Sequence, residues 1–217
     1  YHINDRWQGH ISVPYIQQKT DHIALKPGYE TFTIETEGIG DTVISASYTF
    51  KVESWKLSLG VSLPTGSINE QGDTPRDVGN QQVPYTMQLG SGTYDLLAGL
   101  GDLNSLGRKL SLNDSDNRRT GYENRGYRLG NNYSLSGRYK IDLSSRLQGY
   151  VGLNFQYAKS IHGQDDSLLV GGPPVLYPAS ITNPRLYGGK KINSVFGLLF
   201  KVTKGYQLKI ELGKPIH

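Results

Sequence analysis

Apolar and polar residues alternate along much of the chain, as they do in a β-strand with two different faces. The clearest run is 147–157, where Leu147, Val151, Leu153, Phe155 and Tyr157 alternate with mostly polar residues. The run 133–141 repeats this pattern, and only the four residues 142–145, Asp-Leu-Ser-Ser, separate the two. A tight-turn composition between two alternating runs predicts a β-hairpin.

The same alternation predicts strands along the rest of the chain. We expect them at about 7–17, 40–50, 54–64, 84–100, 106–112, 127–141, 145–159, 189–202 and 205–213. Short turns then alternate with long loops at about 18–39, 65–83, 113–126 and 160–188. Short turns at one end and long loops at the other are typical of outer-membrane β-barrels.

We therefore predict an all-β fold: one antiparallel, up-and-down transmembrane β-barrel domain over residues 1–217, in a bacterial outer membrane. Closed bacterial barrels have even strand numbers, so we expect about 10–12 strands in the complete protein, with parts of the terminal strands outside this chain. The alternative fold is a soluble β-sandwich, which would bury one face in a core. In that fold the buried residues would include Trp55, Leu57, Leu59, Val61 and Leu63.

Aromatic residues favour the barrel, because lipid–water interfaces select two aromatic belts about one strand apart. One group lies next to the predicted short turns and a second group lies near the long-loop ends. The first group is Trp7, Trp55 and Tyr206, and the second is Tyr15, Tyr85, Tyr157 and Tyr187.

The composition excludes several other kinds of protein. The chain has no Cys, which rules out disulfides, thiolate metal ligands and a Cys nucleophile. Its net charge is +4, but the charges are scattered and no nucleic-acid-binding motif is present. Mean hydropathy is −0.47 and no run of about 18 apolar residues occurs, so no transmembrane helix is expected.

The polar face of the predicted strands would line the lumen. Its cations outnumber its acids, and in an open barrel this excess would attract anions. Alternatively, the charges pair with one another and fill a narrow barrel. The lumen-facing candidates are Lys56, Asp95, Arg138, Lys140, Gln148, Asn154, Gln156, Lys201, Lys209 and Glu211.

Three further segments contain residue types that can bind a metal or act in catalysis. Alternating Asp and Asn at 113–119 could bind Ca²⁺, but the EF-hand glycine and distant glutamate are absent, so we predict a solvated loop and no metal. Asp165 and Asp166 near His162, and the pair His10 and Ser12, lack a catalytic motif, so we predict neither an enzyme nor a cofactor.

The loop at 171–187 is rich in proline and apolar residues, which is unusual for a surface loop. It could fold inward as a constriction, bind a partner protein, or simply be a stiffened surface loop. The residues concerned are Pro173, Pro174, Leu176 and Tyr177.

Three short motifs occur in order: Gly-Ile-Gly-Asp at 38–41, Leu-Pro-Thr-Gly at 63–66 and Leu-Gly-Ser-Gly-Thr-Tyr-Asp at 89–95. Proline and glycine in the second motif suit a strand end. Together the motifs resemble the outer-membrane transporter family of the meta-pathway of phenol degradation. The resemblance implies a barrel that passes small hydrophobic or aromatic compounds.

Two functional hypotheses follow for a barrel. The first is an outer-membrane channel or transporter whose partners are the lipid bilayer and a small-molecule solute, including hydrophobic or aromatic compounds. The second is a scaffold or sheath barrel, whose lumen or long loops bind another protein. Nucleic acid is not an expected partner.

Overall fold

The computed structural model describes residues 4–24, 27–28, 30–50, 55–75, 79–102, 110–120, 124–169, 179–203 and 206–216. For Asp102, residues 110–120, Thr203 and Gln207 it describes the backbone alone. Nine strands form one antiparallel sheet, each paired with the next of these strands along the chain. The predicted all-β, antiparallel, up-and-down architecture is therefore confirmed. The strands are β1 (Trp7–Ser12), β4 (Thr42–Thr49), β5 (Trp55–Leu63), β8 (Tyr94–Asp102), β9 (Leu110–Thr120), β11 (Asn132–Asp142), β12 (Leu147–Ala158), β14 (Gly189–Thr203) and β15 (Tyr206–Pro215).

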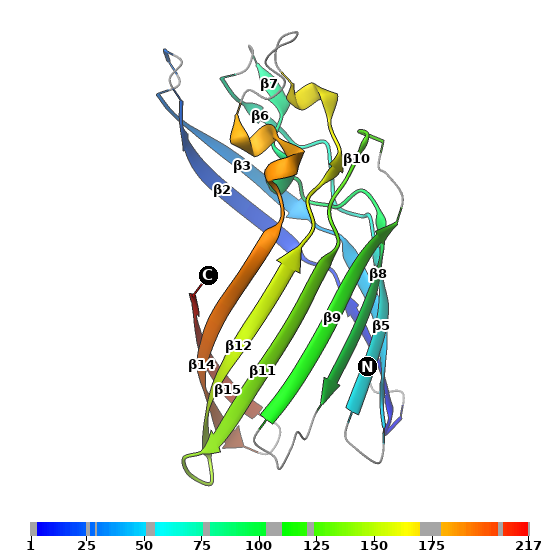
Figure 1. Cartoon of the computed structure of the whole chain (residues 1–217), viewed down its shortest axis with the longest axis vertical. Coiled ribbons are helices and arrows are strands. Elements are labelled where there is room, and N and C mark those ends of the chain that lie inside the picture. The colour runs from blue at the N-terminus through cyan, green and yellow to red at the C-terminus, as the bar shows by residue number, and fades with distance from the viewer. Residues whose placement is uncertain are drawn as a thin grey trace.

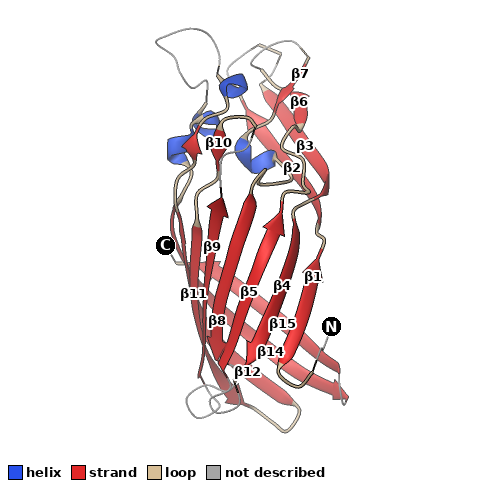
Figure 2. Cartoon of the chain, turned by 90° about the vertical axis from the view of Figure 1, so that its right-hand side faces the viewer, coloured by secondary structure: helices blue, strands red, loops and turns tan. Residues whose placement is uncertain are grey.

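The sheet curves strongly, so that it has a convex outer face and a concave inner face (Figure 2). Its end strands are β1 and β15. Residues opposite each other in neighbouring strands share a face, and the register groups the apolar residues together: Val151 pairs with both Tyr139 and Phe196. The alternation seen in the sequence is thus a division of the whole sheet into two faces.

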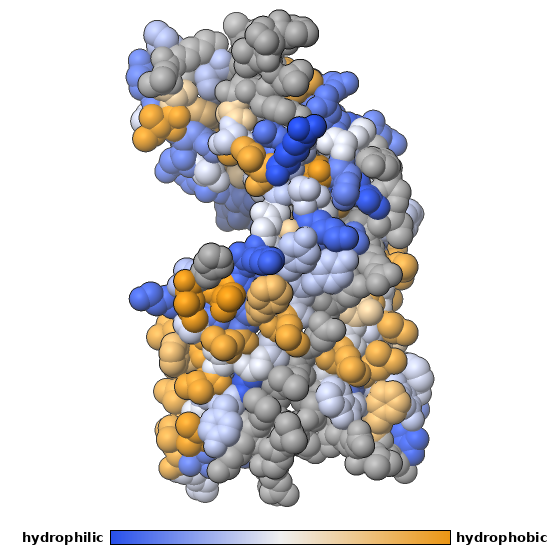
Figure 3. Space-filling view, in the orientation of Figure 1, coloured by the Kyte–Doolittle hydropathy of each residue, from blue (hydrophilic) through white to orange (hydrophobic). Residues whose placement is uncertain are grey.

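The outer face is apolar and uncovered. Leu59 is 57% exposed, Leu153 56% and Leu208 54%. A soluble sandwich would bury Leu59 against a second sheet, which is the opposite of what is found. A space-filling view shows hydrophobic side chains gathered over the strands, below a largely hydrophilic upper part (Figure 3).

The four long connections all lie at one end of the sheet, where they form what we call the cap (Figure 1). Within the described residues, no helix is long and apolar enough to cross a membrane. The cap contains β2 (Tyr15–Ile23), β3 (Thr31–Ile39), β6 (Gln71–Asp73), β7 (Asn80–Gln82), η1 (Tyr85–Met87), β10 (Tyr127–Arg128), β13 (His162–Gly163), η3 (Asp166–Leu168), η4 (Ser180–Thr182) and η5 (Pro184–Leu186).

Three predicted boundaries are wrong. The expected loop 18–39 is largely the β2–β3 hairpin, and the expected strand 84–100 begins only at Tyr94. The expected loop 113–126 is strand β9 as far as Thr120. Asn, Asp and Ser favour turns, but β9 pairs with β8 and with β11 along its length. These two ladders satisfy its backbone groups and override the local preference.

Candidate functional site: the inner face and its cap

All ten predicted lumen residues lie on the inner face. The register opposes them to other inner-face positions, as in the pairs Arg138 with Gly152 and Glu211 with Gly197. Most apolar residues of the same strands occupy the other face, although Leu97, Val195 and Leu199 lie on the inner face. A slip of one residue in any of these strands would turn the inner residues of that strand to the outside.

A cross-strand cluster of charges occupies part of the inner face. The Tyr150 hydroxyl, on β12, donates a hydrogen bond to the Glu211 carboxylate on β15. Lys209 Nζ lies 2.7 Å and Arg138 Nη2 3.5 Å from the same carboxylate oxygen. Both cations also approach the Tyr150 ring, at 5.6 Å for Arg138 and 5.8 Å for Lys209. One carboxylate therefore faces two cations, and the cluster keeps a net positive charge.

Glycines allow this cluster to lie flat against the sheet. A Cβ at Gly197 would be 2.2 Å from Tyr150 Cζ, and a Cβ at Gly152 would be 2.9 Å from Arg138 Cγ. The ring of Tyr150 and the stem of Arg138 therefore cross the neighbouring strands directly over backbone. Only 4% of Tyr150 is exposed. The alternation over 147–157 puts Tyr150 on the polar face, but no role was predicted for it.

The other inner-face residues divide into paired and unpaired groups. Lys56 Nζ donates to Gln8 Oε1 at 2.8 Å, and the buried Asp95 carboxylate accepts from Thr93 Oγ1 at 2.7 Å. Lys140 and Lys201 form no ion pair with any described side chain. The inner face thus contains both an internal ion-pair network and unpaired cations, the two arrangements that the sequence left open.

A cavity of about 610 Å³ lies against the inner face between the β4–β5–β8 wall and the β11–β12 wall. Its lining includes the small or polar residues Ser45, Ser58, Gly60, Gly99, Ser134 and Gln156. Small side chains on a concave wall leave room for a solute.

Asp41 joins the three sequence motifs in one structural unit. Its carboxylate accepts hydrogen bonds from the backbone N–H of Gly66 at 3.0 Å and of Ser91 at 2.8 Å. Thr65 Oγ1 donates to the Gly40 carbonyl at 2.9 Å. Gly66 and Gly90 pack backbone to backbone, so that a Cβ at Gly90 would be 2.3 Å from the Gly66 oxygen. The motifs therefore fasten strand ends together at the base of the cap, and the second motif follows the end of β5 at Leu63, as its proline and glycine predicted.

Two apolar clusters hold the cap together. Ile34 on β3 packs with Val83 and Met87, which fastens the hairpin to the 65–93 connection. Tyr85, Tyr127, Ile161 and Leu168 form the second cluster, with Tyr187 packed against it. Its members come from three of the long connections: Tyr85 from 64–93, Tyr127 from 121–131, and Ile161 and Leu168 from 159–188. The cap is therefore a packed structure rather than a set of independent loops.

Two residues predicted as membrane-interface aromatics belong to this second cluster. Tyr85 is only 4% exposed, and its ring centroid lies 5.4 Å from that of Tyr187. Burial raises the pKa of the Tyr187 hydroxyl above its ordinary value. The prediction was wrong for Tyr85 and Tyr187, because closeness in sequence to a strand end does not reveal that a loop folds back on itself.

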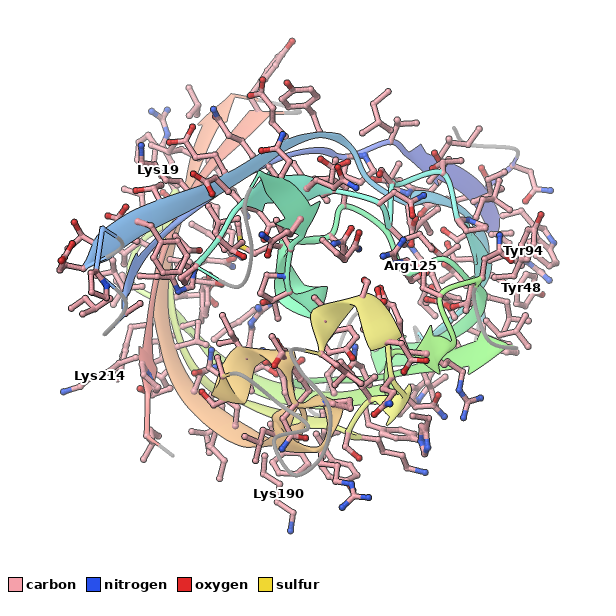
Figure 4. All side chains as sticks on the ribbon, turned by 90° about the horizontal axis from the view of Figure 1, so that it is seen from above. Lys19, Tyr48, Tyr94, Arg125, Lys190 and Lys214 are labelled. Atoms are coloured by element: carbon pink, nitrogen blue, oxygen red, sulfur yellow. The ribbon has the colours of Figure 1, made fainter. Side chains whose placement is uncertain are left out.

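The remaining predicted interface aromatics lie at the surface or beside other aromatic rings of the outer face. Tyr15 is 69% and Tyr206 74% exposed. The Trp7 and Tyr48 ring centroids are 5.0 Å apart. Trp55 is half-buried and Tyr157 is exposed. Tyr48 and Tyr94, which the sequence analysis omitted, point outward in the view from above (Figure 4). Their position at a lipid interface stays a prediction.

Arg125 links three connections within the cap and points inside the outline of the sheet (Figure 4). Its guanidinium donates to Asp165 Oδ2 at 2.6 Å, to Asn69 Oδ1 at 2.9 Å and to Ser167 Oγ at 2.8 Å. Asp165 is buried, and it is paired with this arginine rather than with a histidine. The candidate catalytic carboxylate therefore has a structural partner.

The other candidate segments are described only in part. The searched, described residues contain no group of three His, Asp or Glu side chains placed to bind a metal. Pro173, Pro174, Leu176 and Tyr177 lie outside the described residues. The backbone of 113–119 is part of β9 rather than a loop.

Comparisons with known proteins agree with this fold. No protein-family model matches the chain, and no curated protein matches it either. Among solved structures, it is similar to the COG4313 outer membrane channel from Pseudomonas putida F1, with a TM-score of 0.55 and 15% identity. The alignment covers 100% of this chain and 72% of that chain. At this identity the similarity establishes the fold alone, and the family suggested by the motifs in 38–95 stays a prediction.

Proposed function

We propose that the chain forms the wall of an outer-membrane channel through which small solutes pass along the inner face. The observation that carries this proposal is the division of the sheet into an exposed apolar outer face and a charged, polar inner face. A Lys or Arg on the lipid face at the midplane of a bilayer costs about 2–4 kcal/mol, whereas a charge facing a water-filled lumen does not. The similarity to a channel fold supports the same proposal.

The inner face favours small anions as the solutes. Lys140 and Lys201 have no described carboxylate partner, and the cluster around Glu211 contains two cations for one acid. Confinement by a low-dielectric wall strengthens the field of such charges. Small hydrophobic or aromatic compounds are the alternative solutes that the motif resemblance implies.

Conductance of the purified protein in a planar bilayer tests the proposal. We expect steady conductance and a reversal potential, under a salt gradient, that shows anion preference. Lys140→Gln with Lys201→Gln should weaken this preference, whereas Lys140→Arg with Lys201→Arg keeps both charges and should preserve it. Folded, inserted protein that does not conduct would overturn the channel and favour a barrel that encloses a partner protein.

A further inference from the structure

Three lysines lie on the outer face at the cap end of the sheet. In the sheet register, Lys190 lies opposite Tyr157 and Lys214 lies opposite Ser194. Both lysines are therefore on the outer face of the sheet. Both point away from the sheet in the view from above (Figure 4). Lys159 directly follows β12, and its Nζ lies 5.9 Å from the centre of the Tyr133 ring.

Two tyrosines and an apolar surface accompany these lysines. The Tyr133 and Tyr157 rings stack with their centroids 6.0 Å apart. Farther from the cap along the same strands lie the exposed apolar residues Leu153, Phe155 and Phe196. An amphipathic ring beside a lysine, at the border of an apolar band, is the arrangement that a lipid headgroup region favours.

The outer face of the sheet around these lysines has no described carboxylate. Among the described side chains, the outer faces of β11, β12, β14 and β15 carry no carboxylate. Lys190 and Lys214 form no ion pair with any described side chain. Because no acid described on this face neutralises them, the three lysines are available to bind anions from outside the chain.

We propose that Lys159, Lys190 and Lys214, with Tyr133 and Tyr157, bind the phosphate-bearing headgroups of lipids in the leaflet on the cap side. The lysines supply charge and N–H donors to the phosphate, while the tyrosine rings and the apolar residues below contact the top of the acyl region. This site requires the membrane insertion that the proposed function includes, but it does not require conduction.

Lipid retention in nanodiscs tests the site. The full chain is reconstituted in phosphatidylcholine containing a small fraction of lipid A, a diphosphorylated glycolipid, and lipid A enrichment around the protein is measured after purification. The test variant is Lys159→Gln, Lys190→Gln and Lys214→Gln together. The control removes three exposed cations elsewhere: Lys19→Gln, Arg146→Gln and Lys191→Gln.

We expect the wild type and the control to enrich lipid A, and the test variant to lose roughly tenfold in enrichment. Rising salt should reduce the enrichment, because surface charges are screened. Equal enrichment in all three proteins would overturn the site. Displacement of lipid A by free inorganic phosphate that binds as tightly as the lipid would also overturn it. Failure of the wild type to insert would overturn both this site and the channel, whereas insertion without enrichment would overturn the site alone.

Discussion

The ring of Tyr150 lies over the backbone of Gly197 on the next strand, so closely that a Cβ at 197 would be 2.2 Å from Tyr150 Cζ. This contact directs the hydroxyl across β14 to the Glu211 carboxylate on β15. Three strands are thereby linked through side chains as well as through their backbone ladders. The glycine is required because only hydrogen leaves room for the ring.

Gly197→Ala should therefore destabilise the sheet. The new methyl group must displace the Tyr150 ring, and overpacking of this kind costs about 1–3 kcal/mol. Gly213→Ala is the matched control, because a Cβ there would come no closer than 3.8 Å to Ser194 O. Denaturant midpoints of the folded, heat-modifiable form would measure both. Equal stability of the two variants would contradict the role of the contact, and Tyr150→Ala should relieve the effect of Gly197→Ala.

Glu211→Gln should increase anion preference. The carboxylate is the described acid nearest to Arg138 and Lys209, so its removal leaves two uncompensated cations on the inner wall. The reversal potential under a salt gradient measures the change, with Glu37→Gln on the exposed hairpin as a control that removes an equal charge. A reversal potential equal to that of the wild type would show that the cluster lies away from the solute path.

Alternation alone predicted which residues share a face in β5, β11, β12, β14 and β15. Successive side chains of a strand point to opposite faces whatever surrounds the sheet. Alternation failed for β9, where turn-forming residues lie in a strand held by its two neighbours. It also could not reveal the cap, since the contacts of Tyr85 with Tyr127 and Tyr187 join distant loops. Arg125 and Asp41 were not singled out for the same reason: their partners are far away in sequence.

Asp41→Ala should loosen the base of the cap. The carboxylate accepts two backbone hydrogen bonds, from Gly66 and Ser91, and bonds to a charged acceptor contribute about 1.5–3 kcal/mol each. Hydrogen exchange should speed up at these two amides and in the 65–93 connection, but not in β12 or β14. Asp41→Asn keeps one acceptor oxygen and should have a smaller effect. Unchanged exchange at Ser91 would contradict this account.

Leu59 and Ser58 should report opposite environments. The chain has no cysteine, so Leu59→Cys and Ser58→Cys can each be labelled with a fluorophore without background. We expect a nitroxide on lipid chains to quench the label at 59, and a water-soluble quencher to reach the label at 58, because adjacent residues face opposite sides of the sheet. If neither label is reached by the lipid quencher, the outer face does not contact lipid.

Arg125→Ala should open the cap without unfolding the sheet. Asp165 would lose its ion pair while its side chain is only 5% exposed, and an unpaired buried charge costs about 3–5 kcal/mol. Because Arg125 also holds Asn69 and Ser167, one substitution releases contacts to two other connections. Limited proteolysis should cut within 65–93 and 160–169 faster than in the wild type.

Arg125→Lys keeps the charge but not the planar fork, so its cleavage rate should be intermediate. Asp165→Asn in the Arg125→Ala background should restore part of the resistance by removing the buried charge. Cleavage rates equal to those of the wild type in Arg125→Ala would show that the two apolar clusters hold the cap by themselves.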